Sequence, residues 1–137
     1  GASATALLET FKDTPRAVLL GTRAFWEGVD VPGEALSVLV IAKLPFDVPS
    51  DPIIAARSES FDDPFNEYNL PEAILRFRQG FGRLIRTQTD RGVVVILDKR
   101  VITKPYGKLF IESLPQCTFV QASIANLPEK ATRWLGI

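Results

Sequence analysis

Three side chains suited to holding a phosphate recur at helical spacing in the middle of the chain. They are Gln79, Arg83 and Arg86, within the stretch QGFGRLIR. At about 100° per residue, spacings of four and three residues put all three on one face of a helix. Planar guanidinium groups form paired, charge-assisted hydrogen bonds with phosphate oxygens. The pattern therefore predicts a helix face that binds a phosphate group.

The same stretch predicts a helix at 71–86 with two chemically different faces. Its apolar side chains fall opposite Gln79 and should pack on a sheet, whereas Arg76 falls on the polar side. Gly80 and Gly82 each cost about 1 kcal/mol relative to Ala in a helix. Their presence suggests that another group approaches the helix backbone closely. The alternative is a solvated basic face with incidental glycines.

A second group of polar and aromatic residues lies in the segment 21–33, GTRAFWEGVDVPG, directly after an apolar run. In open parallel sheets, ligands bind beyond the carboxyl ends of the strands. Phe25 and Trp26 could stack on bases, or they could be core side chains. Asp30 could accept a hydrogen bond from a ribose hydroxyl, or it could be an ordinary turn residue.

The elements that must position these residues are indicated by apolar runs. Strands are predicted at 16–22, 35–46, 92–98 and 117–122. Because these runs are continuous rather than alternating, the strands should be covered on both faces, as in a parallel sheet. Helices are predicted at 3–12, 50–60, 71–86 and 103–113, and the segment 47–71 should lie over one sheet edge. This order predicts an α/β layered domain.

Composition limits the possible functions. The 137 residues suffice for one domain with a core, and 16 basic and 16 acidic residues give a formal net charge of zero. No global positive field therefore attracts nucleic acid, so any such contact must be local. Cys117, the one cysteine, is expected to be a small core residue. The absence of histidine argues further against a metal site, and none is expected in this chain.

Membrane and export signals are not found in the sequence. No apolar run reaches the roughly 18 residues of a membrane helix. The N-terminus has no basic-then-apolar pattern typical of a signal peptide. We therefore expect a cytoplasmic protein without a membrane partner.

Two of these stretches resemble known helicase motifs. GTRAFWEGVDVPG resembles motif V of superfamily-2 helicases, and QGFGRLIR resembles motif VI, whose pattern is Q-x-x-G-R-x-x-R. The stretches KLPFDVPSDP, YNLPEAILRFRQGFGRLIRTQTDRGVVVILDKR and KPYGKLFIESLP are similar to the DinG/XPD group of DNA helicases, nearer the bacterial DinG-type branch. The resemblance covers about residues 5–115.

This resemblance implies that residues 1–137 are the second RecA-like motor domain of such a helicase and a fragment of a longer chain. Its fold would be a parallel sheet with helices on both faces, incomplete at the N-terminus. ATP and Mg²⁺ would be bound mainly by the first RecA-like domain, which would also carry any iron–sulfur cluster. The chain lacks a G-x-x-x-x-G-K-[ST] phosphate loop, so the fragment alone should not hydrolyse ATP.

The resemblance also implies roles for individual residues. Arg83 and Arg86 would be catalytic arginine fingers that reach the γ-phosphate. Nucleotide contacts are implied for Gln79, Glu27, Gly28 and Asp30. Contacts with single-stranded DNA are implied for Thr22, Arg23, Phe25 and Trp26.

Two other functions stay open at the level of sequence. One is a RecA-like binding or regulatory module without its own ATPase activity. The intact set of Gln79, Arg83 and Arg86 favours the motor domain over this module. The other is a basic-faced domain for anionic metabolites, which would bind nucleotide tightly without any partner domain.

Overall fold

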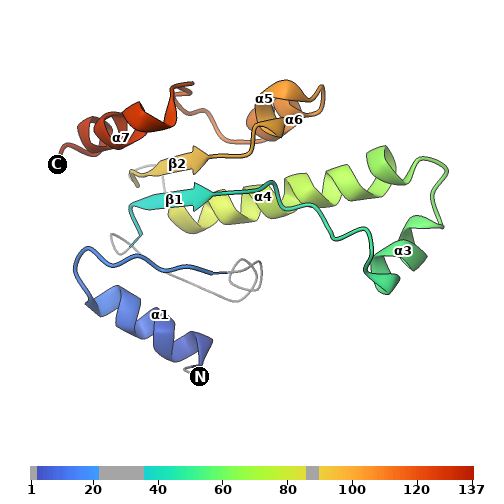
Figure 1. The fold of residues 1–137 in the computed structure, drawn as a ribbon, viewed down its shortest axis with the longest axis horizontal. Helices are drawn as coiled ribbons and strands as arrows, with labels where there is room; N and C mark the ends of the chain where they lie inside the picture. Colours follow the sequence, from blue (N-terminus) through green and yellow to red (C-terminus); the bar gives the residue numbers. More distant parts are fainter. Residues whose placement is uncertain (1–2, 22–35, 86–89) are drawn as a thin grey trace.

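The structure is a computed structural model that describes residues 3–21, 36–85 and 90–137. Two short parallel strands lie at its centre (Figure 1). Strand β1 (Val38–Ile41) pairs with β2 (Val93–Ile96), from Val38 opposite Val93 to Ile41 opposite Ile96. Because parallel neighbours need a long crossover, the chain between them runs through several helices before it returns to the sheet.

Six α-helices are found among the described residues: α1 (Ala4–Asp13), α3 (Pro52–Ser58), α4 (Leu70–Leu84), α5 (Arg100–Thr103), α6 (Gly107–Glu112) and α7 (Leu127–Leu135). A π-helical turn, η2 (Phe65–Asn69), leads directly into α4, and a 3₁₀ turn, η3 (Ile124–Asn126), leads into α7. In Figure 1, α4 extends along the sheet, α5 and α6 follow the carboxyl end of β2, and α7 lies beside β2. None of these helices is long and apolar enough to cross a bilayer.

Local sequence signals explain several helix boundaries. Ser3 caps α1 by accepting the Ala6 N–H at 3.2 Å, and Asp51 caps α3 by accepting the Ile53 N–H at 2.9 Å. At the other end of the chain, α7 stops at Gly136, whose φ of 73° is the left-handed conformation that glycine adopts most easily.

The core forms where α4 packs on one face of the sheet. Its buried members are Ile41, Leu44, Leu70, Ala73, Phe77, Val101 and Phe110. Phe77 and Phe110 are fully buried, and their rings meet edge to face with centroids 5.4 Å apart. Along β1, Ile41 faces this core while Val40 points to the other face and is 54% exposed. Among the described residues the second face is therefore covered incompletely.

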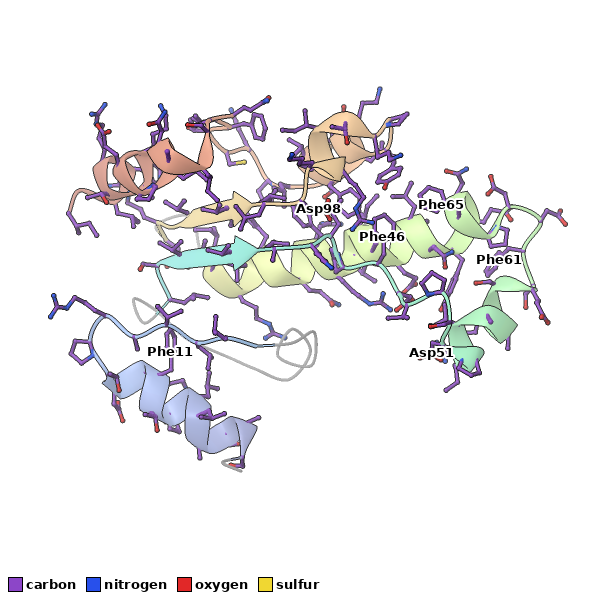
Figure 2. The ribbon with its side chains drawn as sticks, viewed as in Figure 1. Phe11, Phe46, Asp51, Phe61, Phe65 and Asp98 are labelled. Carbon is purple, nitrogen blue, oxygen red and sulfur yellow. The ribbon has the colours of Figure 1, made fainter. Side chains whose placement is uncertain are left out.

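An aromatic cluster extends the core beyond the carboxyl end of β1. Phe46 stacks on Phe65 with centroids 5.9 Å apart, and it meets Tyr106 and Phe110 edge to face (Figure 2). These contacts join the segment after β1 to both η2 and α6. They hold the entry of α4 close to the strand ends.

Two predicted strands do not form. Residues 16–21, the described part of the 16–22 run, and residues 117–122 have no strand structure. Val18 and Leu20 are largely exposed, and so is Cys117, which is therefore not the core residue that we expected. An apolar run becomes a strand only where a partner strand offers hydrogen bonds, and here neither run is paired with one.

Other elements are shorter than their sequence patterns predicted. The runs at 35–46 and 92–98 form strands only over Val38–Ile41 and Val93–Ile96. The predicted helix at 103–113 forms only as α6, from Gly107 to Glu112, and the separate helix α5 ends at Thr103. Pro105 disfavours helical backbone at Lys104, which is extended at ψ 145°. The short helix predicted at 50–60 is confirmed as α3, and the one at 3–12 as α1.

Candidate functional site

Helix α4 carries the described part of the predicted phosphate-binding face. It spans Leu70–Leu84, close to the predicted 71–86, with Pro71 and Glu72 in its first turn and Arg83 in its last. The first turn of a helix tolerates a proline. The negative charge of Glu72 near the start of α4 and the positive charge of Arg83 near its end both match the helix dipole. Gln79 is exposed and Arg83 is half-buried. The helix ends at Ile85, whose backbone is extended.

A hollow of about 300 Å³ opens beside Gln79. It is lined by Leu75, Arg78, Gln79, Phe81, Gly82, Ile85 and Pro115. A Cβ added to Gly82 would meet no described atom within 4 Å apart from its chain neighbours and the backbone of its own helix, whereas Gly80 is buried. At Gly82, a group that comes close to the backbone would therefore have to come from outside the described residues. That such a group exists stays a prediction.

Arg76 was wrongly predicted to share the outward face with Gln79. Its guanidinium instead contacts the Asp47 carboxylate, with Nη1 2.9 Å from Oδ1 and Nη2 3.3 Å from Oδ2. The two side chains are only 12% and 2% exposed. Arg76 lies at the border between the two faces of α4, and its long side chain reaches inward to the segment after β1. This guanidinium is committed inside the domain.

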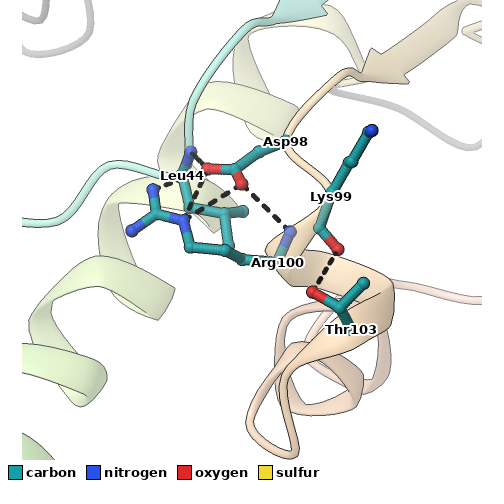
Figure 3. A network of polar contacts seen from close by, with 5 residues as sticks. All are labelled: Leu44, Asp98, Lys99, Arg100 and Thr103. Carbon is teal, nitrogen blue, oxygen red and sulfur yellow. Dashed lines mark hydrogen bonds and ion pairs between the residues drawn. The ribbon is translucent and has the colours of Figure 1, made fainter.

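A polar network lies at the opposite end of the sheet, where β1 and β2 end (Figure 3). Asp98 follows β2, and its Oδ2 accepts the Leu44 N–H at 2.8 Å. Arg100 donates from Nη2 to Oδ2 at 2.6 Å and from Nε to Oδ1 at 3.0 Å. The side-chain hydrogen bond from Arg100 is the main reason that the pKa of Asp98 falls from 3.8 to about 2.

Sequence reasoning did not single out Asp98. The signal was present, because an acidic residue ends the most apolar run of the chain and an arginine stands two residues later. Such a pair at the carboxyl end of a buried strand is well placed to cross-link neighbouring strands. Here it joins the end of β2 to the backbone that follows β1.

A second hollow, of about 420 Å³, lies at this carboxyl edge. It is lined by Ala42, Lys43, Leu97, Asp98, Lys99 and Arg100. Its one carboxylate, Asp98, is hydrogen-bonded to Arg100, so Lys43 and Lys99 leave a local excess of positive charge. The carboxyl edge of a parallel sheet is where ligands commonly bind, and this edge would attract an anion.

The two hollows lie toward opposite ends of the strands. In Figure 1, α4 runs back against the direction of β1 and β2, so its last turn lies toward their amino ends. A Cβ on Gly92, just before β2, would meet the Leu84 side chain 2.6 Å away, which agrees with this placement. The described structure therefore does not bring Arg83 and Asp98 into one site.

Most of the predicted site residues lie outside the described residues. They are Thr22, Arg23, Phe25, Trp26, Glu27, Gly28, Asp30 and Arg86. Within the described residues, no group of three or more His, Cys, Asp or Glu side chains could hold a metal ion. Gln79 and Arg83 are thus the predicted site residues for which the structure supplies positions.

Residues 1–117 match the family model of the helicase C-terminal domain. The chain is 48% identical over 131 residues to the 3′-5′ exonuclease DinG of Bacillus subtilis, which covers 93% of this chain. It is 50% identical over 113 residues to the ATP-dependent DNA helicase YoaA of Escherichia coli, covering 80% of this chain. It is 41% identical over 138 residues to the ATP-dependent helicase DinG of Mycobacterium tuberculosis, covering 98%.

These relatives are much longer than this chain. The matched region spans 14% of the Bacillus protein, 18% of the Escherichia protein and 20% of the Mycobacterium protein. The likeness is therefore to one part of each relative.

Proposed function

Because the chain belongs to the helicase C-terminal domain family of DinG/YoaA-type DNA helicases, we propose that it is the second RecA-like motor domain of an ATP-dependent DNA helicase. In such an enzyme, ATP and Mg²⁺ would lie between two RecA-like domains. This chain would supply one wall of that cleft, and the other domain would supply the phosphate loop and the metal ligands. Any iron–sulfur cluster would also belong to the part outside this chain.

The observation that carries the proposal is the arrangement of α4. Gln79 is exposed beside a hollow, and Arg83 follows it by one turn of the same helix. Exposed Leu75 lies one turn before Gln79 and lines the same hollow. A surface that mixes polar phosphate ligands with exposed apolar side chains suits contact with another domain. We infer that this face of α4 points toward the first RecA-like domain.

Arg83 and Arg86 would act as arginine fingers. They would place positive charge near the γ-phosphate, where negative charge grows as the terminal phosphoryl group is transferred to water. In enzymes that use such fingers, each is worth roughly 10³–10⁵ in turnover. Gln79 would contact the nucleotide or hold this helix beside it.

The segment that resembles motif V would connect nucleotide and DNA. In this proposal the nucleotide would be contacted by Glu27, Gly28 and Asp30. Single-stranded DNA, on which the motor would translocate, would be contacted by Thr22, Arg23, Phe25 and Trp26. Cycles of closing and opening of the two domains around ATP would drive that movement.

The test is ATP hydrolysis by the full-length parent protein, with and without single-stranded DNA. Wild type is compared with Arg83→Ala and Arg86→Ala, and with Arg133→Ala as a control on the exposed surface of α7. We expect DNA to stimulate wild type and the control. Each finger variant should lose turnover by about 10³-fold while it still binds ATP.

The opposite outcome identifies the alternative function. If both finger variants hydrolyse ATP at the wild-type rate, these arginines do not act on the nucleotide. The domain would then be a RecA-like binding or regulatory module without ATPase activity. Tight ATP binding by the isolated chain would instead point to the domain for anionic metabolites.

A further inference from the structure

Four consecutive residues shortly after β1, Leu44–Asp47, are held one after another by contacts from the rest of the domain. We call them the 44–47 segment. On one side, the Asp98 carboxylate accepts the Leu44 N–H at 2.8 Å. The Arg100 guanidinium lies over the Phe46 ring, 5.2 Å from its centroid. Two residues that follow β2, Asp98 and Arg100, thus hold Leu44 and Phe46 in place.

Helix α4 fixes the other half through Arg76. Its Nη1 lies 2.9 Å from Asp47 Oδ1 and donates to the Pro45 carbonyl at 3.5 Å. Glu72, one turn earlier and more exposed, lies at the limit of ion-pair distance, 4.0 Å from Nη2. Asp47 is therefore the main partner of Arg76, and this buried contact ties α4 to the segment after β1.

The position of Arg76 on α4 gives this contact a consequence for the proposed site. Arg76 lies three residues before Gln79 and seven before Arg83, so all three belong to two successive turns of one rigid helix, and any shift of Arg76 moves the other two with it. The hydrophobic effect that buries Phe77 is non-directional, so it restricts a small slide or rotation of α4 less sharply than a directional polar contact does. A planar guanidinium paired with a carboxylate fixes both distance and direction.

We propose that Arg76 and Asp47 are a positioning pair that sets the axial position and rotation of α4, and so the aim of Gln79 and Arg83 at the nucleotide. The proposal rests on the function proposed above. Neither member of the pair touches the nucleotide. Both act through the helix to which Arg76 belongs.

The alternative is that the pair only stabilises the fold. Buried ion pairs add little net stability compared with apolar residues of similar size, because removing two charges from water offsets their attraction. A pair of apolar side chains could therefore keep the stability that Arg76 and Asp47 provide, but it could not fix the orientation of α4 as the ion pair does. This difference separates the two roles by experiment.

The experiment measures ATP turnover and thermal unfolding of the full-length parent protein in the presence of single-stranded DNA. The variants are Arg76→Lys, which keeps the charge but loses the planar fork, and the double variant Arg76→Met/Asp47→Leu. The matched controls are Arg133→Lys and Arg133→Met/Glu129→Leu, which alter an exposed ion pair of 2.8 Å on α7. Arg83→Ala is measured in parallel.

For Arg76→Lys we expect kcat to fall by roughly tenfold to a hundredfold, with KM for ATP changed by less than about threefold, because misplacing a catalytic group by about 1 Å has effects of this size. The double variant should unfold at about the wild-type temperature and keep the low kcat. The two controls should match wild type in both measurements.

Two results would overturn the positioning role. One is a kcat for Arg76→Lys within twofold of wild type. The other is a double variant whose kcat and unfolding temperature are both at the wild-type level. If the double variant does not fold, Arg76→Lys alone decides. If Arg83→Ala turns over normally, the proposed function fails and the positioning role fails with it. If Arg83→Ala is inactive while Arg76→Lys is normal, only the positioning role is refuted.

Discussion

Replacing Asp98 with Asn should loosen the carboxyl edge of the sheet in a pH-dependent way. Asp98 is nearly buried, with 8% of its side chain exposed, and both oxygens accept hydrogen bonds. Folding lowers its pKa from 3.8 to about 2, chiefly through Arg100. At about 1.4 kcal/mol per pKa unit, the ionised carboxylate stabilises the folded state by about 2.5 kcal/mol at pH 7.

This stabilisation should disappear in acid. Because the folded-state pKa is the lower one, the contribution is complete above about pH 4 and is lost as the pH falls toward 2. It should be about 1 kcal/mol at pH 3 and well under 1 kcal/mol at pH 2. The amide that Asp98→Asn introduces has no charge to lose, so the difference between variant and wild type should shrink in the same range.

Hydrogen exchange of the Leu44 amide measures the effect directly, since this N–H is bonded to Asp98 and Pro45 has no N–H of its own. After correction for the intrinsic exchange rate, Asp98→Asn should lower its protection roughly sixtyfold at pH 7 and about twofold at pH 2. Glu129→Gln, in an exposed ion pair on α7, is the control and should change nothing. Equal protection in wild type and Asp98→Asn at pH 7, or a roughly sixtyfold difference that persists at pH 2, would refute the assigned role of the carboxylate.

Two further substitution pairs test the packing. Gly82→Ala should stabilise the isolated chain by up to about 1 kcal/mol, because among the described residues its Cβ would collide with nothing. The Cβ of Gly107→Ala would instead collide with the Val101 carbonyl and lower the unfolding temperature. A destabilised Gly82→Ala, or an unaffected Gly107→Ala, in thermal unfolding would contradict this. Phe110→Ala should cost about 3–5 kcal/mol in urea unfolding, since Phe110 is fully buried, against little for the exposed Phe119→Ala. Similar losses at both positions would mean that the core is placed wrongly.

The helix with the candidate phosphate ligands could be predicted because its signals are local. Its apolar period, its early proline and its charged ends all lie within fifteen residues of each other. The late start of the helix predicted at 103–113 was missed, although its signal is local, since Pro105 restricts the residue before it.

The features that sequence reasoning missed depend on distant partners. Periodicity gives the direction of a Cβ atom, so it placed Arg76 at the edge of the polar face. It could not reveal that Asp47, twenty-nine residues earlier, would draw the guanidinium inward. Strand lengths failed for the same reason, because β1 and β2 extend only as far as they pair with each other. Whether Val18 and Cys117 are buried likewise depends on whether another part of the fold covers them, and both are exposed.

The parallel pairing of β1 and β2 also constrains the order of assembly. These strands are adjacent in space, yet residues 42–92 separate them, so their pairing must close a long loop at a large cost in chain entropy. Helix α4 lies within that loop and contacts β1. During synthesis from the N-terminus, β1 and α4 both leave the ribosome before β2 does. The helix that carries Gln79 and Arg83 can thus pack on β1 before β2 is synthesised, so that β2 pairs with a strand that α4 already supports.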